Sequence, residues 1–142
     1  MKNNKLLMIM LFLLIAITLV GAVALVVVMK YTDGAEEKEP SIEEVLEASV
    51  DINQITTNLA SDDFIRISFK VETDSKKAKE ELEKRDFQVK NIIIQELSEK
   101  KAEDLQGKEG KISLQEDLKS KINSLMQNGK VESVYITESL LQ

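Results

Sequence analysis

An uncharged apolar run near the amino end constrains this chain more than any other feature. The run from Leu6 to Met29 spans 24 residues and contains no Asp, Glu, Lys, Arg or His. An α-helix rises ~1.5 Å per residue, so a helix of this length can cross a hydrocarbon core about 30 Å thick. The rest of the chain is polar and charged. The sequence therefore predicts a transmembrane helix over residues 6–29, joined to one small domain.

The charges on either side of the run predict its orientation. Lys2, Lys5 and the α-amino group precede it, whereas residues 31–49 hold seven acidic residues and one lysine. Cytoplasmic flanks of membrane spans carry an excess of Lys and Arg. Residues 1–5 are thus expected in the cytoplasm and the domain outside it, although Lys30 on the far flank opposes this orientation.

A cleaved signal peptide is the alternative interpretation of the same run. Ala22-Val23-Ala24 resembles a small-residue cleavage site. A signal core is usually about 7–15 residues long, shorter than this run. Cleavage there would also leave an apolar start, Leu25 to Met29, on the mature chain. An uncleaved anchor is the favoured interpretation.

Composition excludes several classes of function. The chain has 142 residues, a net charge of −6, no cysteine and no histidine. Disulfides and thiol chemistry are therefore absent, and the commonest general base and metal ligand is missing. The chain is acidic and its lysines are scattered, whereas a nucleic-acid-binding surface has clustered Lys and Arg. We predict a protein that is not an enzyme, with no catalytic residue, no cofactor, no metal site and no nucleic-acid partner.

The remaining candidates for chemistry are poor. Three acidic pairs fall in predicted turns or on helix surfaces: Asp62-Asp63, Glu103-Asp104 and Glu116-Asp117. Neighbouring helical residues point in different directions, so the two carboxylates of the last pair do not face one another. The segment Gly107 to Gly110 lacks the spacing and the Lys-Ser/Thr of a phosphate-binding loop.

An acidic linker is predicted over residues 30–49. This segment contains Asp33-Gly34, Pro40 and a dense run of acids, with little to bury. Ser41-Ile-Glu-Glu is suited to capping a short helix that ends near Leu46. Binding of a basic partner or calcium is the alternative use of the acids; a solvated spacer is favoured.

Residues 50–142 are expected to form a small α+β domain of the order β-β-α-α-α-β. An irregular first strand follows from Val50, Ile52, Ile55 and Leu59, and Ser61-Asp62-Asp63 forms a turn. Clean alternation over Phe64–Thr73 predicts a second, antiparallel strand with alternate residues buried. A final strand, Lys130–Gln142, should place Val134, Ile136 and Leu140 on one face.

Three helices are expected between the second and third strands. Asp74-Ser75 caps the first, Lys76–Arg85, with Ala78 and Leu82 turned inward. A bend near Asp86 leads into a second helix ending near Glu99, whose apolar stripe is Phe87, Ile93, Ile94 and Leu97. After a turn at Ala102–Leu105, punctuated by Gly107 and Gly110, Leu114, Leu118, Ile122 and Leu125 define a third helix, with Asn128-Gly129 as its C-cap.

Several short motifs in the carboxyl half carry a resemblance to a known family. They are Lys101-Ala-Glu-Asp-Leu105, Glu109-Gly-Lys111, Leu118, Ile122-Asn123, Gly129-Lys-Val131 and Val134-Tyr-Ile-Thr-Glu138. With the order of basic amino end, span, acidic linker and domain, they resemble the FliL family of flagellar basal-body-associated membrane proteins. Asp86-Phe87 departs from the family pattern, since relatives often carry Leu-Pro there.

The resemblance implies a location and a role that no motif here demonstrates. It implies a single-pass protein of the bacterial cell membrane with an extracytoplasmic domain similar to the stomatin-type fold. It also implies homo-oligomeric rings at the flagellar basal body, around the stator complex. The expected function is support of stator engagement and torque in swimming and swarming motility.

A membrane-tethered scaffold or binding module of the cell envelope, unrelated to motility, is the alternative. A stomatin-like domain alone fits both functions, because fold does not fix function. Arg66, Lys70 and Lys90 are exposed positions that an interface could use, but a solvated surface is the favoured interpretation of each. No site residue is assigned from them.

Overall fold

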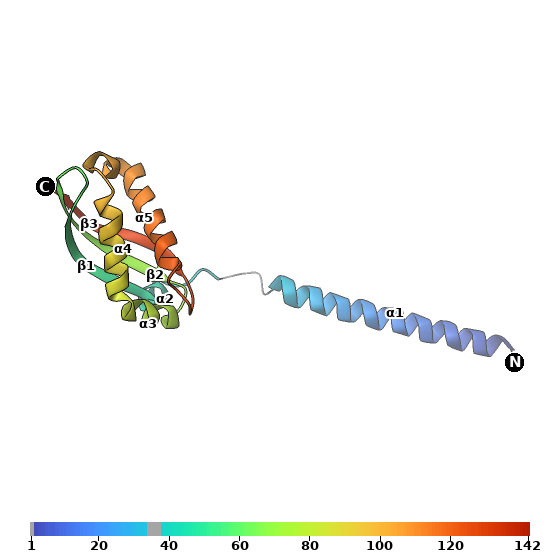
Figure 1. Cartoon of the computed structure of the whole chain (residues 1–142). Coiled ribbons are helices and arrows are strands. Elements are labelled where there is room, and N and C mark those ends of the chain that lie inside the picture. The colour runs from blue at the N-terminus through green and yellow to red at the C-terminus, as the bar shows by residue number, and fades with distance from the viewer. Residues whose placement is uncertain (1, 34–37) are drawn as a thin grey trace. The chain divides into compact units, whose positions relative to one another are not determined.

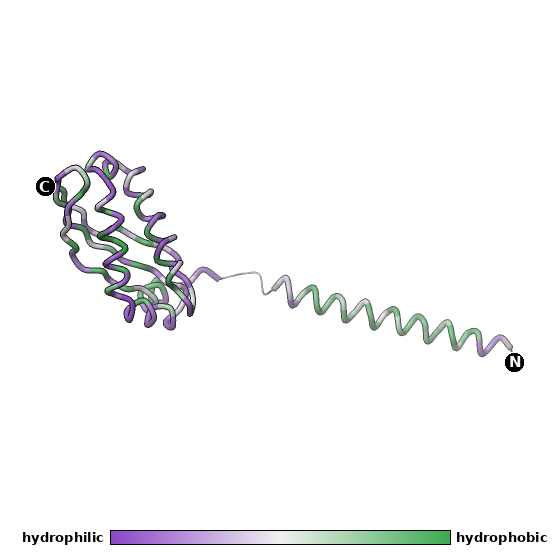
Figure 2. The backbone as a smooth tube through the Cα atoms, viewed as in Figure 1, coloured by the Kyte–Doolittle hydropathy of each residue, from purple (hydrophilic) through white to green (hydrophobic). Residues whose placement is uncertain are grey.

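The structure, a computed structural model, describes residues 2–33 and 38–142 (Figure 1). It divides into two compact units, residues 1–39 and residues 40–142. The first unit contains helix α1 (Lys2–Asp33), which covers the whole apolar run and continues past Met29. Its large apolar side chains are exposed along its length. Figure 2 shows the hydrophobic colour that runs along this helix. Part of the predicted linker, residues 34–37, lies outside the described residues.

The second unit begins with the short helix α2 (Ile42–Glu47). The Ser41 side chain accepts a hydrogen bond from the Glu44 backbone N–H, and the Glu44 carboxylate accepts one from the Ser41 N–H. This reciprocal capping box stabilises the first turn and confirms the predicted short helix.

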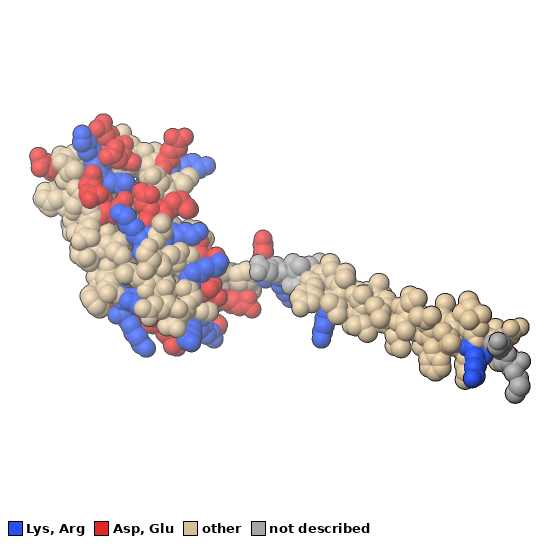
Figure 3. Space-filling view, turned by 45° about the vertical axis from the view of Figure 1, so that its right-hand side comes forward, with Lys and Arg blue, Asp and Glu red and all other residues tan. Residues whose placement is uncertain are grey.

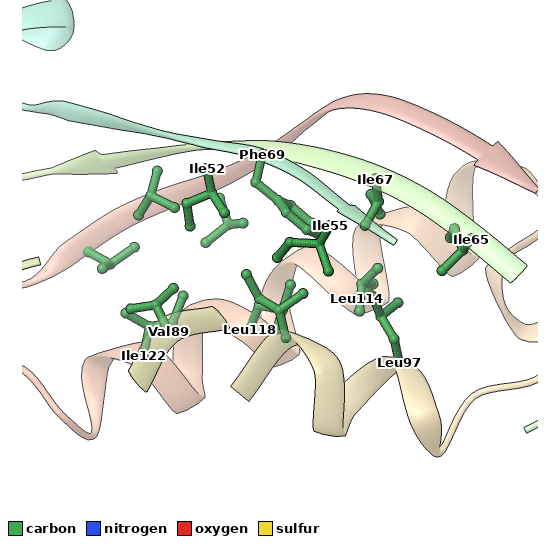
Figure 4. Packing of buried hydrophobic residues seen from close by; sticks show 14 of the residues in the cluster. Ile52, Ile55, Ile65, Ile67, Phe69, Val89, Leu97, Leu114, Leu118 and Ile122 are labelled. Atoms are coloured by element: carbon green, nitrogen blue, oxygen red, sulfur yellow. The ribbon is translucent and has the colours of Figure 1, made fainter. Parts of the chain in front are cut away.

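A three-stranded antiparallel sheet follows, in the order β1-β2-β3. Its strands are β1 (Ser49–Asn58), β2 (Phe64–Thr73) and β3 (Val131–Leu141). Between β2 and β3 the chain forms α3 (Lys76–Lys84), α4 (Asp86–Ser98), the 3₁₀ helix η1 (Ala102–Leu105) and α5 (Gly107–Asn123). Helices α3, α4 and α5 lie on one face of the sheet (Figures 1 and 4). The predicted α+β class and element order are confirmed.

The irregular alternation in β1 has a structural cause. The pairing register with β2 shifts between Ile52 and Ile55, so two residues three positions apart both reach the core. A bulge of this kind inserts residues into one strand and re-aims the side chains beyond it. The predicted turn at Ser61-Asp62-Asp63, between β1 and β2, is also present, with Asp62 at φ 64°.

One hydrophobic cluster holds the sheet and helices together (Figure 4). Alternate residues of β2 point into it, and α4 and α5 each supply a stripe at four-residue spacing. The central members are Ile65, Ile67, Phe69 and Val71 of β2, Val89, Ile93 and Leu97 of α4, and Leu114, Leu118 and Ile122 of α5. Full burial of each such side chain contributes about 1.5–3 kcal/mol.

The predicted apolar stripe of α4 was partly wrong. Phe87 is 71% exposed and Ile94 is also exposed, whereas Ile93 and Leu97 are buried as expected. The helix is oriented by Val89, which pairs with Ile93 and Leu97 on one face. Phe87 and Ile94 therefore lie on the other side of the helix. The predicted bend is present, because α3 ends at Lys84 and α4 begins at Asp86.

Gly107 and Gly110 lie within helix α5 and not in a turn before it. Gly107 has φ +71°, which favours glycine at the start of the helix. A Cβ atom at Gly110 would collide with the backbone carbonyl of Asp104 in η1. Glycine at position 110 thus permits the close packing of η1 on the first turn of α5.

The predicted end of the third helix was wrong. Helix α5 ends at Asn123, so Leu125 lies beyond it and is half-buried. Gly129, at φ +122°, belongs to the following loop; a Cβ atom there would lie 2.5 Å from Asp74 Oδ1 and 2.8 Å from Ala78 Cβ. Glycine is needed because this loop crosses closely over the start of α3.

The prediction for β3 held at one end of the strand only. Val134 is buried and Ile136 is half-buried, opposite Val71 and Phe69 of β2. The register then shifts, so Leu140 pairs with Arg66 and lies on the opposite face, exposed to solvent.

Two phenylalanines on β2 provide a matched test of the core. Phe69 is 1% exposed and Phe64, on the same strand, is 50% exposed. We expect Phe69→Ala to lower the free energy of unfolding of residues 40–142 by about 3–5 kcal/mol, through lost burial and a cavity. Phe64→Ala should cost much less. Urea unfolding measures both; equal losses would contradict this packing.

Candidate functional site

The face of the sheet opposite α3, α4 and α5 carries polar side chains from all three strands. We call it the outer face and define it by residues that alternate with the core positions of the three strands. They are Asp51, Arg66, Ser68, Lys70, Glu72, Tyr135, Glu138 and Leu140.

Cross-strand polar contacts fix the side chains of the outer face. Lys70 Nζ lies 3.0 Å from Asp51 Oδ1 on β1. The Tyr135 hydroxyl on β3 donates to Glu72 Oε2 at 3.0 Å. Ser68 Oγ donates to the Glu138 carboxylate at 3.4 Å. Each contact is exposed and weak, since surface pairs contribute about 0–1 kcal/mol, but together they orient one charged pattern.

The three basic residues considered from sequence do not form one cluster. Arg66 and Lys70 share the outer face, whereas Lys90 lies on α4 and pairs with Asp86 at 2.8 Å. Only Arg66 and Lys70, of these three basic residues, therefore lie on the same surface.

The acidic pairs have structural partners. The Asp63 carboxylate accepts from the Ser61 hydroxyl at 2.6 Å, and Asp104 accepts from the Lys101 backbone N–H at 2.8 Å. Asp117 pairs with Lys100 at 3.5 Å. Among residues 2–33 and 38–142, no group of three acidic side chains is arranged to hold a metal ion.

Glu81 is a buried residue that sequence reasoning missed. Its carboxylate on α3 accepts from the backbone N–H groups of Gln127 and Asn128 and from Arg85 Nε, at 2.6–3.2 Å. Burial alone would raise the pKa of Glu81, but these hydrogen bonds and the Arg85 charge outweigh burial and lower the pKa below that of an ordinary glutamate. Glu81 thus holds the loop after α5 against α3.

Glu96 plays a similar part between α4 and α5. It is buried and pairs with Lys121 of α5 and, at 3.4 Å, with Lys100. Burial acts to raise the pKa of Glu96, and the two ammonium groups together lower it. A charged residue on a helix normally indicates a solvated face, so no sequence signal distinguished Glu81 or Glu96 from their exposed neighbours.

Fold and surface together define a class: a long apolar helix followed by a small α+β domain that offers surfaces for contact. The family described as "Flagellar basal body-associated protein FliL" matches residues 49–142, from the first residue of β1 to the carboxyl end. The chain belongs to the FliL family. It is accordingly a non-enzymatic, flagellar basal-body-associated protein of bacterial motility, with one N-terminal apolar helix consistent with a membrane anchor.

Two relatives support the assignment. The chain is 51% identical to "Flagellar protein FliL" of Bacillus subtilis (strain 168) over 122 residues, which cover 86% of each chain. It is 28% identical to "Flagellar protein FliL" of Aquifex aeolicus (strain VF5) over 79 residues, 56% of this chain and 49% of that one.

Glu81 predicts a pH dependence with a definite sign. Its pKa is lowered in the folded protein, so its contribution to stability is present above the unfolded pKa and is lost as pH falls through the folded value. Glu81→Gln should reduce stability at neutral pH, and the deficit should shrink as pH falls from the unfolded pKa of this carboxyl through its lower folded pKa. Urea midpoints of residues 40–142, measured from neutral to acid pH, check this.

Glu80→Gln is the matched control, since Glu80 is the exposed neighbour on the same helix. It should leave the midpoint nearly unchanged at every pH. A deficit in Glu81→Gln that stayed constant down to acid pH would show that the carboxylate charge is not what holds the loop.

Proposed function

We propose that this protein supports stator engagement and torque at the flagellar basal body, as an oligomeric collar around the stator complex. The observation that carries the proposal is the family match over the entire sheet-and-helix domain, joined in one chain to an apolar helix. Two relatives carry the name "Flagellar protein FliL", which supports a role at the flagellum, and the domain's surfaces would supply the means of contact.

The proposed topology follows from the charge pattern. Residues 1–5 are cytoplasmic, residues 6–29 cross the membrane once, and residues 30–49 form an acidic linker to an extracytoplasmic domain, residues 50–142. Ion and proton pathways normally need ionisable groups within the membrane, and the span has none. The helix therefore anchors the domain, and ion conduction belongs to the stator.

The domain is suited to scaffolding by its fold and its surface. A stomatin-type fold, to which the α+β domain is similar by the family resemblance, is compatible with assembly of identical copies. Single contacts on the outer face are weak, but several copies fixed in one membrane hold a partner by multivalency. Such a collar would hold the extracytoplasmic segment of the stator in its active form without any reactive group.

Deletion of the gene in the native host tests the proposal. We expect normal filaments by staining, with reduced torque on a tethered bead under load and poor swarming. Absent filaments would instead indicate a role in basal-body assembly. Unchanged filaments and torque would remove the motor function and favour an envelope scaffold unrelated to motility.

A charge reversal tests whether the outer face is the contact surface. Arg66→Glu changes an exposed residue, so the free energy of unfolding should change by no more than about 0.5 kcal/mol. Torque should nonetheless fall in cells that carry only this variant. Lys108→Glu, an exposed change on α5 away from the outer face, is the control and should retain torque. Equal effects would exclude the outer face.

A further inference from the structure

One stripe on the exposed side of α4 carries no charge. Phe87, Asn91, Ile94 and Ser98 follow one another at spacings of four, three and four residues and are all exposed. None of them is charged, in a chain of which 31% is charged. Charged side chains are distributed unevenly over the domain surface (Figure 3). A 4-3-4 stripe is the spacing with which a helix meets another helix.

A groove opens beside the start of this stripe. It has a volume of about 250 Å³ and is lined by Phe87, Gln88, Asn91, Ile92 and Leu125. The lining is uncharged, and an aliphatic side chain is the group that it suits. Large exposed aromatic residues beside a pocket are typical centres of protein interfaces. We call this surface the α4 groove.

Helix α2 presents a complementary surface. Ile42 and Leu46, one turn apart, are 65% and 50% exposed. Three glutamates surround them on the same short helix: Glu43, Glu44 and Glu47. An amphipathic helix enters a groove through apolar anchors at this spacing. Within one chain, α2 lies against β2 and α3, so its anchors stay exposed and the α4 groove stays open.

We propose that α2 of one copy docks in the α4 groove of the next, through Ile42 and Leu46. The inference rests on the proposed collar and names its contact. Two different surfaces meet, so the contact is head-to-tail, and such a contact closes into a ring when the rotation between copies allows it. Lys90 directly precedes Asn91 of the groove lining and pairs with Asp86 at 2.8 Å. In the docked state it exchanges this partner for a carboxylate of α2.

The donor and acceptor surfaces of the proposed contact are connected through α3. Glu47 of α2 pairs with Lys76 of α3 at 3.1 Å, and α3 leads directly into Phe87 in the first turn of α4. Both surfaces therefore lie at the end of the domain where α2 and α3 meet (Figure 1).

Cysteine cross-linking of the full-length chain tests the contact, because the native sequence has no cysteine. Leu46→Cys and Asn91→Cys, combined in one chain and oxidised in membranes, should give a ladder of multimers. Disulfides form only when the two Cα atoms lie about 4.4–6.8 Å apart, so the ladder reports direct contact. Leu46→Cys with Ser113→Cys, an exposed position on α5, should give none.

Each other pattern overturns the proposal. Dimers from Leu46→Cys alone or Asn91→Cys alone would show that like surfaces meet. A ladder from the Ser113→Cys control would show collision without specificity. An absence of disulfides, while a lysine-reactive cross-linker still captures multimers of the unmodified protein, would mean that the collar forms through a different surface.

Phe87→Glu, added to the Leu46→Cys/Asn91→Cys chain, should reduce the ladder about tenfold, as expected for removal of a central aromatic contact. Because Phe87 is exposed, circular dichroism of this variant should match that of the parent. An unchanged ladder would overturn the groove as acceptor. Motility measurements distinguish the proposed contact between copies from the proposed stator function. If the ladder forms but deletion of the protein leaves torque unchanged, the contact stands and the stator function is excluded.

Discussion

The single hydrophobic cluster between the sheet and its helices is the interaction on which the domain depends. Strand β2 pairs with a neighbour on each side, α4 lies against β1 and α5 against β3, and the inward residues of β2 belong to the same cluster. The chain leaves the sheet after Thr73 and re-enters it at Val131, so the last strand can pair only after the intervening helices have turned back. Burial of their apolar stripes offsets the entropy of closing this long connection.

Two polar side chains, the Glu81 carboxylate and the Asn123 amide, determine how that connection ends. Glu81 binds the backbone N–H groups of Gln127 and Asn128, and Asn123 binds both the N–H and the carbonyl of Val131. These contacts satisfy backbone groups that a longer α5 would have satisfied internally. The helix therefore stops at Asn123, and the chain crosses from α5 to β3 under control of side chains from α3 and α5.

This explains which parts of the fold could be predicted from the sequence. Period-two alternation located β2 to the residue, and the spacing of Leu114, Leu118 and Ile122 located the core face of α5. The pair Asn128-Gly129 misled because a glycine needed for close approach to Asp74 has the same local signature as a helix cap. Local pattern describes an element, but its end depends on groups that are distant in sequence.

Which apolar residues of α4 are buried also depends on groups that are distant in sequence. Ile94 and Phe87 were expected inside because apolarity on a helix usually marks the buried side. Only the folded arrangement shows that Val89 and Leu97 occupy that side and leave the other apolar residues outside.

The region matched by the family model begins between the two surfaces of the proposed contact. It begins at Ser49, so it includes the α4 groove but not α2, which ends at Glu47. The acceptor surface on α4 therefore lies within the domain that the family shares, whereas the donor helix α2 lies in the segment before it. Changes in that short segment could alter how copies meet without disturbing the core. Assembly geometry can then vary between family members that share one domain fold, because the residues that determine it are not the residues that stabilise the fold.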